Sequence, residues 1–185
     1  MATRNGFTPS RQPATDWIRN MPVGGAGQPV AKGDAVNQIA GTCFPVTAGQ
    51  DPATQGYGVV LAVYTTANRP LTFNNTKFIA SGTPGRADIC FDPDQTYVVR
   101  CETSVGPGDV GKNVTVSAAA ANSLTGLSGM SVQIPSSAST NDLFKIINVS
   151  PFDELSGKGT GAAAGQGVEV RWNRHVLKAP VSPTA

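Results

Sequence analysis

The chain has 185 residues, of which only 14% are charged, and its net charge is +2. This length is typical of one domain that can bury a core without disulfides or a metal. The charges form no runs, which argues against a nucleic-acid surface and a membrane-binding patch. No stretch reaches the roughly 18 apolar residues that span a bilayer. The N-terminus lacks the apolar region of a secretory signal, so we expect a chain that is made in a cytoplasm and stays there.

Residues 1–32 show neither helical nor strand periodicity, and they contain prolines at positions 9, 13, 22 and 29. Because proline removes backbone donors and interrupts regular structure, we expect an extended N-terminal arm. Its large apolar residues, Phe7, Trp17 and Ile18, are costly to leave in water. They are predicted to anchor the arm on the surface of a partner.

From residue 33 the pattern changes to short runs of β-branched and aromatic residues, separated by Gly, Pro, Asn and Asp. Helical periodicity is nearly absent. The pattern predicts an all-β domain over residues 33–177, either a β-sandwich or a small jelly-roll-like barrel, followed by a short tail over residues 178–185. The expected strands lie near residues 35–39, 57–65, 86–91, 96–103, 113–118, 131–135, 143–149 and 168–173.

A turn is predicted at DPDQ, residues 92–95, because Pro93 presets φ and the Asp92 side chain accepts backbone hydrogen bonds. The turn is expected to join the strands on either side into a hairpin. A hairpin could place Cys90 opposite Cys101. Because a cytoplasm is reducing, we nevertheless predict that these thiols are free.

The stretch GPGDVGKN, residues 106–113, matches the phosphate-binding pattern G-x-x-x-x-G-K-[ST] except at Asn113. That pattern binds phosphate only where a helix begins at the lysine. Here a strand pattern follows Lys112, and Asn113 lacks the hydroxyl that binds Mg²⁺. We therefore predict a turn, with positive φ at Gly106, Gly108 and Gly111, and no nucleotide site.

No catalytic constellation is apparent. The single histidine, His175, has no assignable carboxylate partner, and no serine lies in a nucleophile elbow. Carboxylates cluster as Asp92 with Asp94 and as Asp153 with Glu154, both in predicted turns. Calcium binding there is the minor alternative, and we expect no metal, no cofactor and no enzymatic activity.

Several motifs, taken in order, resemble a family of tailed-bacteriophage head proteins that act as capsid decoration or cement proteins. The similarity extends from residue 4 to about residue 177. The motifs are RNGFTPSR (4–11), GDAV (33–36), GVVLAVY (58–64), DPDQTYVVR (92–100), SVGPGDVGKN (104–113), TGLSGM (125–130) and VEVRWNRHVL (168–177).

The resemblance implies a β-sandwich or barrel module in the virion, on the outside of the capsid. Its expected partners are the major capsid protein and other copies of the chain, as a homotrimer. The alternatives are another virion component, such as a head-fibre base, neck or tail protein, or a carbohydrate-binding β-sandwich module. The residues of the arm expected to contact the capsid are Arg4, Asn5, Phe7, Pro9, Arg11, Trp17 and Ile18.

Overall fold

A computed structural model describes residues 6–24, 29–47, 56–64, 67, 78–117, 127–135, 142–149 and 167–177. Within these residues the regular structure is nearly all β, which confirms the predicted fold class. The helical elements described are two short 3₁₀ turns, η1 (Thr15–Trp17) and η2 (Pro107–Asp109). In this part of the chain no helix has the length and apolar character needed to cross a membrane.

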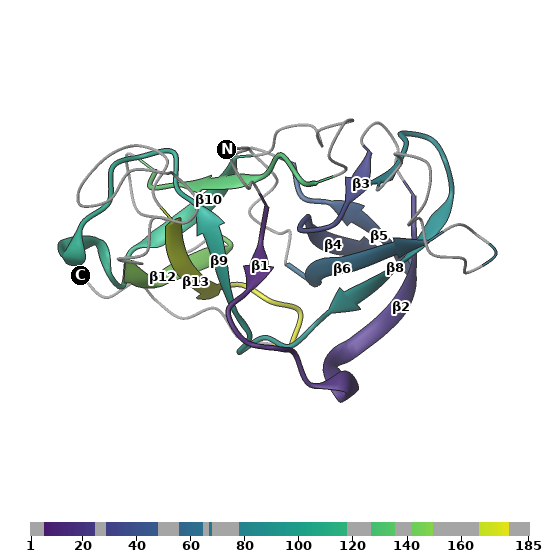
Figure 1. Cartoon of the computed structure of the whole chain (residues 1–185), viewed down its shortest axis with the longest axis horizontal. Helices are drawn as coiled ribbons and strands as arrows, with labels where there is room; N and C mark the ends of the chain where they lie inside the picture. The colour runs from purple at the N-terminus through teal and green to yellow at the C-terminus, as the bar shows by residue number, and fades with distance from the viewer. Residues whose placement is uncertain are drawn as a thin grey trace.

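Five strands close into a small barrel in the order β2-β5-β4-β6-β8, on the right in Figure 1. Four of the neighbouring pairs are antiparallel. The parallel contact of β2 with β5, at Val23 and Cys43, closes the ring. The strands are β2 (Ile18–Val23), β4 (Ala35–Ile39), β5 (Thr42–Pro45), β6 (Gly58–Tyr64) and β8 (Gly85–Cys90).

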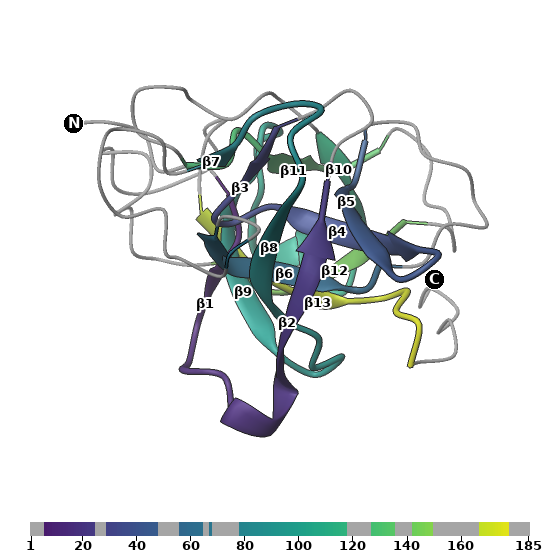
Figure 2. The same cartoon turned by 90° about the vertical axis from the view of Figure 1, so that its right-hand side faces the viewer.

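Six other strands form an antiparallel sheet in the order β1-β9-β13-β12-β10-β11, beside the barrel (Figures 1 and 2). A separate short pair joins β3 (Val30–Ala31) to β7 (Phe78–Ile79). The strands of the large sheet are β1 (Thr8–Pro9), β9 (Thr96–Arg100), β10 (Asn113–Ser117), β11 (Ser131–Gln133), β12 (Phe144–Val149) and β13 (Gly167–Trp172).

Residues 35–37 of β4 and 58–60 of β6 are buried on both faces and lie between two hydrophobic cores. Successive side chains of a strand point to opposite faces. Val36 and Val60 therefore face the barrel interior, whereas Ala35 and Val59 pack in the core of the large sheet. The continuous apolar run at the start of β6, in place of an alternating one, is the pattern expected of a segment that is buried on both faces.

The predicted hairpin around residues 92–95 is wrong, although the turn itself is present. Asp92 accepts a bond from the Asp94 N–H, at 2.8 Å. The strands on either side belong to different sheets: β8 pairs with β2 and β6, while β9 pairs with β1 and β13. Turn chemistry reverses the chain locally, but the apolar faces decide which strand it meets next. Cys90 and Cys101 are therefore not cross-strand partners, and all three cysteines are buried and free.

The predicted separation of an arm, residues 1–32, from the domain does not hold for residues 6–24 and 29–32. Strand β1 joins the edge of the large sheet, and β2 is a member of the barrel. Ser10 N–H donates to the Thr96 carbonyl, at 2.9 Å. Since bonded positions alternate along an antiparallel strand, the nitrogen of Pro9 points away from β9, where proline costs no ladder bond. Arg4, Asn5, Asp153, Glu154 and the tail, residues 178–185, lie outside the described residues.

Phe7 is a core residue, only 2% exposed. Its ring stacks on Phe144 with centroids 4.6 Å apart and meets Tyr97 edge-on at 6.3 Å. The Phe7 side chain, which the sequence predicted to anchor the arm on a partner, is thus buried inside its own domain.

The chain enters this core through a close contact between two glycines. Gly6 has φ 94° and Gly33 has φ 91°, a region that favours glycine. A Cβ on Gly6 would lie 2.6 Å from the Cβ of Ser128. Phe7 N–H donates to Gly33 O at 2.8 Å, and Gly33 N–H donates to Val60 O at 2.9 Å. Gly33 therefore links Phe7, the residue before β1, to barrel strand β6.

Asp34, next in the chain, has a carboxylate that is only 3% exposed. It accepts the Ala31 N–H at 2.7 Å. Burial raises its pKa from 3.8 to about 6, although hydrogen bonds from Ser128 and Ala31 oppose the rise. Asp34 therefore binds its proton more tightly in the folded protein than in the unfolded chain.

We predict that Phe7→Ala lowers the free energy of unfolding by about 3–5 kcal/mol, because it leaves a cavity in the core. Trp17→Ala should cost only about 1 kcal/mol, the worth of its aromatic pair with Phe91. Urea unfolding of both variants measures the difference. Equal stability of Phe7→Ala and wild type would contradict the burial of this ring.

We also predict that Asp34→Asn removes a pH dependence of stability. The folded-state pKa of Asp34 lies above its ordinary value, so its contribution is fully present below pH 3.8 and is lost as the pH rises to about 6. The shift corresponds to a loss on the order of 3 kcal/mol. Denaturant unfolding of wild type and Asp34→Asn is measured from about pH 3.5 to about pH 7, a range that spans the ordinary and the raised pKa of the carboxyl group. The two proteins are compared by how steeply the free energy of unfolding changes with pH. The exposed Asp16→Asn is the control and should keep the wild-type slope.

Candidate functional site

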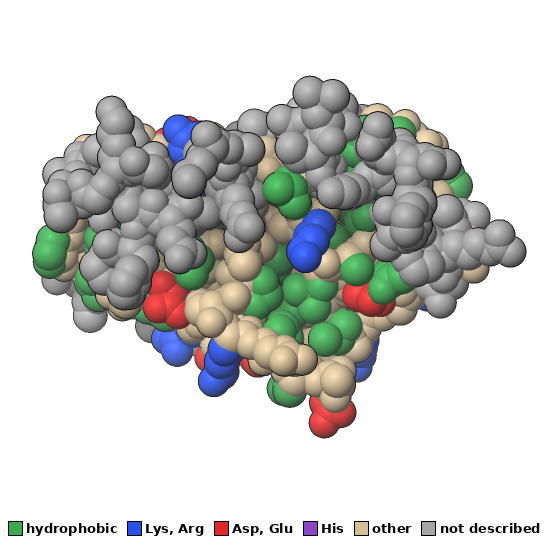
Figure 3. All heavy atoms as spheres, in the orientation of Figure 1, with side chains coloured by type: hydrophobic (Ala, Val, Ile, Leu, Met, Phe, Trp, Pro, Cys, Tyr) green, Lys and Arg blue, Asp and Glu red, His purple; other side chains and the backbone are tan. Residues whose placement is uncertain are grey.

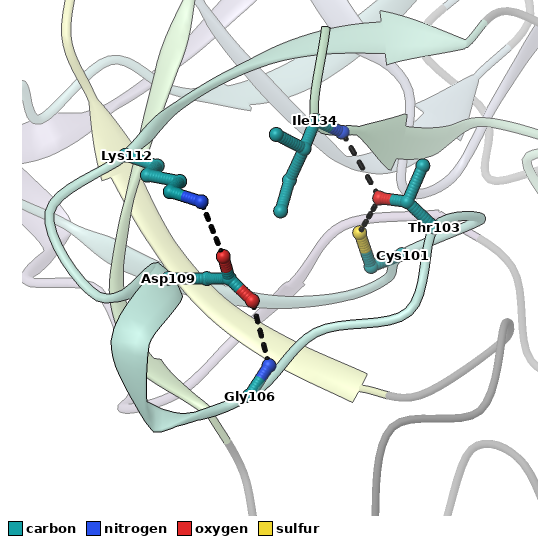
Figure 4. A network of polar contacts seen from close by, with 6 residues as sticks. All are labelled: Cys101, Thr103, Gly106, Asp109, Lys112 and Ile134. Carbon is teal, nitrogen blue, oxygen red and sulfur yellow. Dashed lines mark hydrogen bonds and ion pairs between the residues drawn. The ribbon is translucent and has the colours of Figure 1, made fainter. Parts of the chain in front are cut away.

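The stretch that resembles a phosphate-binding loop is a closed turn, and its lysine is already paired (Figure 4). Lys112 Nζ lies 2.7 Å from Asp109 Oδ1, and Gly106 N–H donates to Asp109 Oδ2 at 2.7 Å. The bond from Lys112 is the main reason that the pKa of Asp109 is lowered. Strand β10 begins at Asn113, so no helix follows the lysine, as the sequence predicted.

The backbone of this turn is also occupied. Gly111 N–H donates to Ile146 O at 2.8 Å, and Lys112 N–H donates to Asp109 O at 3.1 Å. Of the three glycines predicted to have positive φ, Gly111 does, at 93°. The prediction is wrong for Gly106, which is extended at −138°, and for Gly108, which lies outside the left-handed region because η2 forms there.

The segment that leads into this turn is held in the same way. Thr103 Oγ1 accepts the Ile134 N–H at 3.1 Å and lies 3.3 Å from the Cys101 sulfur (Figure 4). Burial raises the pKa of the Cys101 thiol, so it is a poor nucleophile. The polar groups around this turn therefore serve the fold.

His175 is fully buried, and its ring links the backbone at Leu177 to the backbone at Tyr57. Its Nδ1 accepts the Leu177 N–H at 3.2 Å, and its Nε2 lies 2.6 Å from Tyr57 O. Because Nδ1 is the acceptor, Nε2 carries the proton and donates to that carbonyl. Both ring nitrogens are thus engaged with backbone, which is the structural role the sequence favoured for a lone histidine.

The described residues hold no group of three or more His, Cys, Asp or Glu side chains arranged for a metal ion. In the Asp92 and Asp94 pair, Asp92 accepts a backbone N–H, and Asp94 lies 3.8 Å from the Arg171 guanidinium. The second predicted cluster falls outside the described residues.

A loop of residues 10–17, here called the projecting loop, extends from the body of the molecule between β1 and β2 (Figures 1 and 2). Almost all of it is exposed. Both of its ends are tied to the connection between β8 and β9. At the start, the buried Gln95 donates to Arg11 O at 3.1 Å, and at the end, Phe91 N–H donates to Trp17 O at 3.0 Å. The loop is held at its base while its tip faces solvent.

Trp17 ends this loop at one mouth of the barrel, beside three other side chains that we name the barrel-mouth cluster: Trp17, Arg19, Tyr57 and Phe91. The Trp17 ring, 36% exposed, lies 5.1 Å from the Phe91 ring, and Phe91 stacks on Tyr57 at 6.2 Å. The Arg19 guanidinium carbon lies 4.5 Å from the Phe91 centroid. Burial raises the pKa of Tyr57, and the charge and hydrogen bond of Arg19 oppose that rise.

The residues predicted to bind a capsid are therefore divided by the fold. Phe7 is buried and Pro9 pairs with Tyr97 in the sheet, so neither forms a free arm. Ile18 is half-buried in β2, whereas Arg11 and Trp17 are exposed on the projecting loop.

The sequence reasoning missed Arg19 and Phe91. The spacing of Trp17 and Arg19, two residues apart, could have placed them on one side of a strand, but the prolines had argued against a strand there.

A second surface feature is a groove of about 430 Å³ between β1 and β6. Hydrophobic side chains gather beside β1 on this face in Figure 3. The lining residues include Phe7, Leu61 and Leu127, with Lys32 among them.

Comparison with known proteins found no family model that matches the chain and no curated sequence that matches it.

We predict that the protein does not bind Mg-ATP. Lys112 is paired with Asp109, and the turn presents no helix N-terminus to a phosphate. Calorimetric titration of wild type and Lys112→Ala with Mg-ATP should give only heats of dilution. Saturable micromolar binding that Lys112→Ala abolishes would contradict the prediction.

Proposed function

We propose that this chain is a structural protein of a tailed-bacteriophage head, which binds the outside of the major capsid protein lattice as a decoration protein, most simply as a homotrimer. The family resemblance of its motifs provides the identity of the partner. The observation that carries the proposal is the projecting loop: an exposed segment, tied at both ends to the body, that presents a half-exposed tryptophan to solvent.

Tryptophan and arginine are the residues that most often dominate protein interfaces, and a large ring left in water is costly. Trp17 and Arg19 lie against the same phenylalanine ring, so two such residues form one surface. Phe7 is buried in the core of its own domain. Trp17 is therefore the exposed aromatic residue among the predicted capsid contacts that the structure describes.

A loop that is already ordered loses less conformational entropy on binding than a free arm. Ordering costs about 1–2 kcal/mol for each residue of a flexible segment. The hydrogen bonds from Gln95 to Arg11 O and from Phe91 N–H to Trp17 O order the loop during folding, so less conformational entropy is lost on binding. Attachment through this loop in several copies would add avidity on a symmetric lattice.

The test is the binding of purified protein to undecorated capsids of the phage, measured by co-sedimentation and by the heat resistance of the particles. We expect Trp17→Ala to weaken binding at least about tenfold, as expected at an interface hot spot, and to leave the protein folded. Thr8→Ala is the matched control, since it alters an exposed side chain of β1 outside the projecting loop.

Wild-type affinity of Trp17→Ala, with particles equally resistant to heat, would exclude the projecting loop as the contact. Failure of the wild type to bind any capsid, together with saturable binding to an array of cell-surface glycans, would favour the carbohydrate-binding alternative.

A further inference from the structure

The barrel-mouth cluster places a positive charge and an apolar ring against one buried aromatic side chain. Phe91 is 6% exposed and forms the floor. Trp17 lies against it at 5.1 Å between ring centroids, and the Arg19 guanidinium carbon lies 4.5 Å from its centroid. The two exposed groups are therefore within reach of one or two adjacent residues of a bound chain.

Arg19 is held in place by neutral groups. The ring of Phe91 attracts the guanidinium through its π face, and the charge of Arg19 opposes the rise that burial causes in the pKa of Tyr57. Among the described residues, no carboxylate lies within ion-pair distance of Arg19. Two acidic residues lie next to members of the cluster in the sequence. Asp16 precedes Trp17 and is exposed on the projecting loop, and Asp92 follows Phe91 and accepts the Asp94 N–H through its Oδ1.

A guanidinium carries five donors in a planar fork. The face of the Phe91 ring cannot accept all five of these donors. A carboxylate matches the fork with two parallel hydrogen bonds, and such charge-assisted bonds are stronger than neutral ones. The half-exposed Trp17 beside it offers an apolar surface to the neighbouring residue of the same ligand.

We propose that the barrel-mouth cluster is a binding site for an extended protein segment that carries a Glu or Asp next to an aliphatic residue. Arg19 binds the carboxylate, and Trp17 covers the aliphatic side chain. The charge of Arg19 selects an acidic segment over a basic one, and the tryptophan selects an apolar neighbour. The inference rests on the proposed function in one respect: it identifies the kind of capsid segment that the projecting loop would meet.

The tested probe is the tripeptide acetyl-Leu-Glu-Leu-amide, compared with acetyl-Leu-Gln-Leu-amide and acetyl-Leu-Lys-Leu-amide. The protein has two tryptophans, Trp17 and the buried Trp172, so a change in the exposed emission reports on Trp17. Titration is followed by tryptophan fluorescence and by ¹H–¹⁵N chemical shifts of the full chain. This assay needs no capsid, so its result is independent of the proposed virion role.

We expect saturable binding of the Glu peptide, with shifts at Trp17, Arg19 and Phe91, and at least about tenfold weaker binding of the Gln and Lys peptides, the loss of one charge-assisted pair. Arg19→Gln should lose the preference for Glu, and Arg19→Lys should retain only part of it because the fork is absent. Arg171→Gln, which alters a partly exposed arginine of β13 outside the projecting loop and the cluster, is the control and should bind as wild type.

Absence of binding by the Glu peptide, or equal affinities for the three peptides, would overturn the proposal. A retained preference for Glu in Arg19→Gln would also overturn it, since the carboxylate would then be bound elsewhere. If N-acetylglucosamine or galactose saturates the same shifts while the peptides do not, the cluster is a sugar site instead. If the Glu peptide binds but capsids do not, the site stands and the virion role fails.

Discussion

The hydrogen bond from Phe7 N–H to Gly33 O is the constraint on which the two halves of this fold depend. It lies where β1 of the large sheet meets the turn that enters β4 of the barrel. Gly6 and Gly33 approach each other there because neither has a side chain, and the Phe7 ring beyond them completes the core against Phe144. The same contact thus fixes the backbone path and fills the larger core.

That contact also protects an open edge. Strand β1 stands at the end of the six-stranded sheet, a position that can pair with another chain. Phe7 and Pro9 offer no free backbone donor on the outward side of this edge, because Phe7 N–H is bonded to Gly33 O and Pro9 has no N–H. The barrel, being closed, has no free edge of its own. The prolines that predicted an extended arm are therefore compatible with strands, and Pro9 is useful at an edge.

The projecting loop follows from the same arrangement. Strand β1 belongs to the large sheet and β2 to the barrel, so the chain between them must cross from one body to the other. The connection between β8 and β9 makes the same crossing, and the two connections support each other through Gln95 and Phe91. The barrel-mouth cluster arises at this crossing, where Trp17 from one connection meets Phe91 from the other.

Local propensity and turn chemistry are enough to predict the all-β class, the eight strands with clear β-branched runs, the turn at residues 92–95 and the absence of a helix after Lys112. The alternation of Tyr97 and Val99 with Val98 and Arg100 also marks the buried face of β9, which continues to Cys101. Three other features became clear from the folded structure: residues 6–24 belong to the domain, β8 and β9 lie in different sheets, and Arg19 contacts Phe91. Those features depend on partners far apart in the chain, 84 residues in the case of Gln95 and Arg11. Local pattern carries no information about such pairings, because any apolar strand face can satisfy any other until the whole core is assembled.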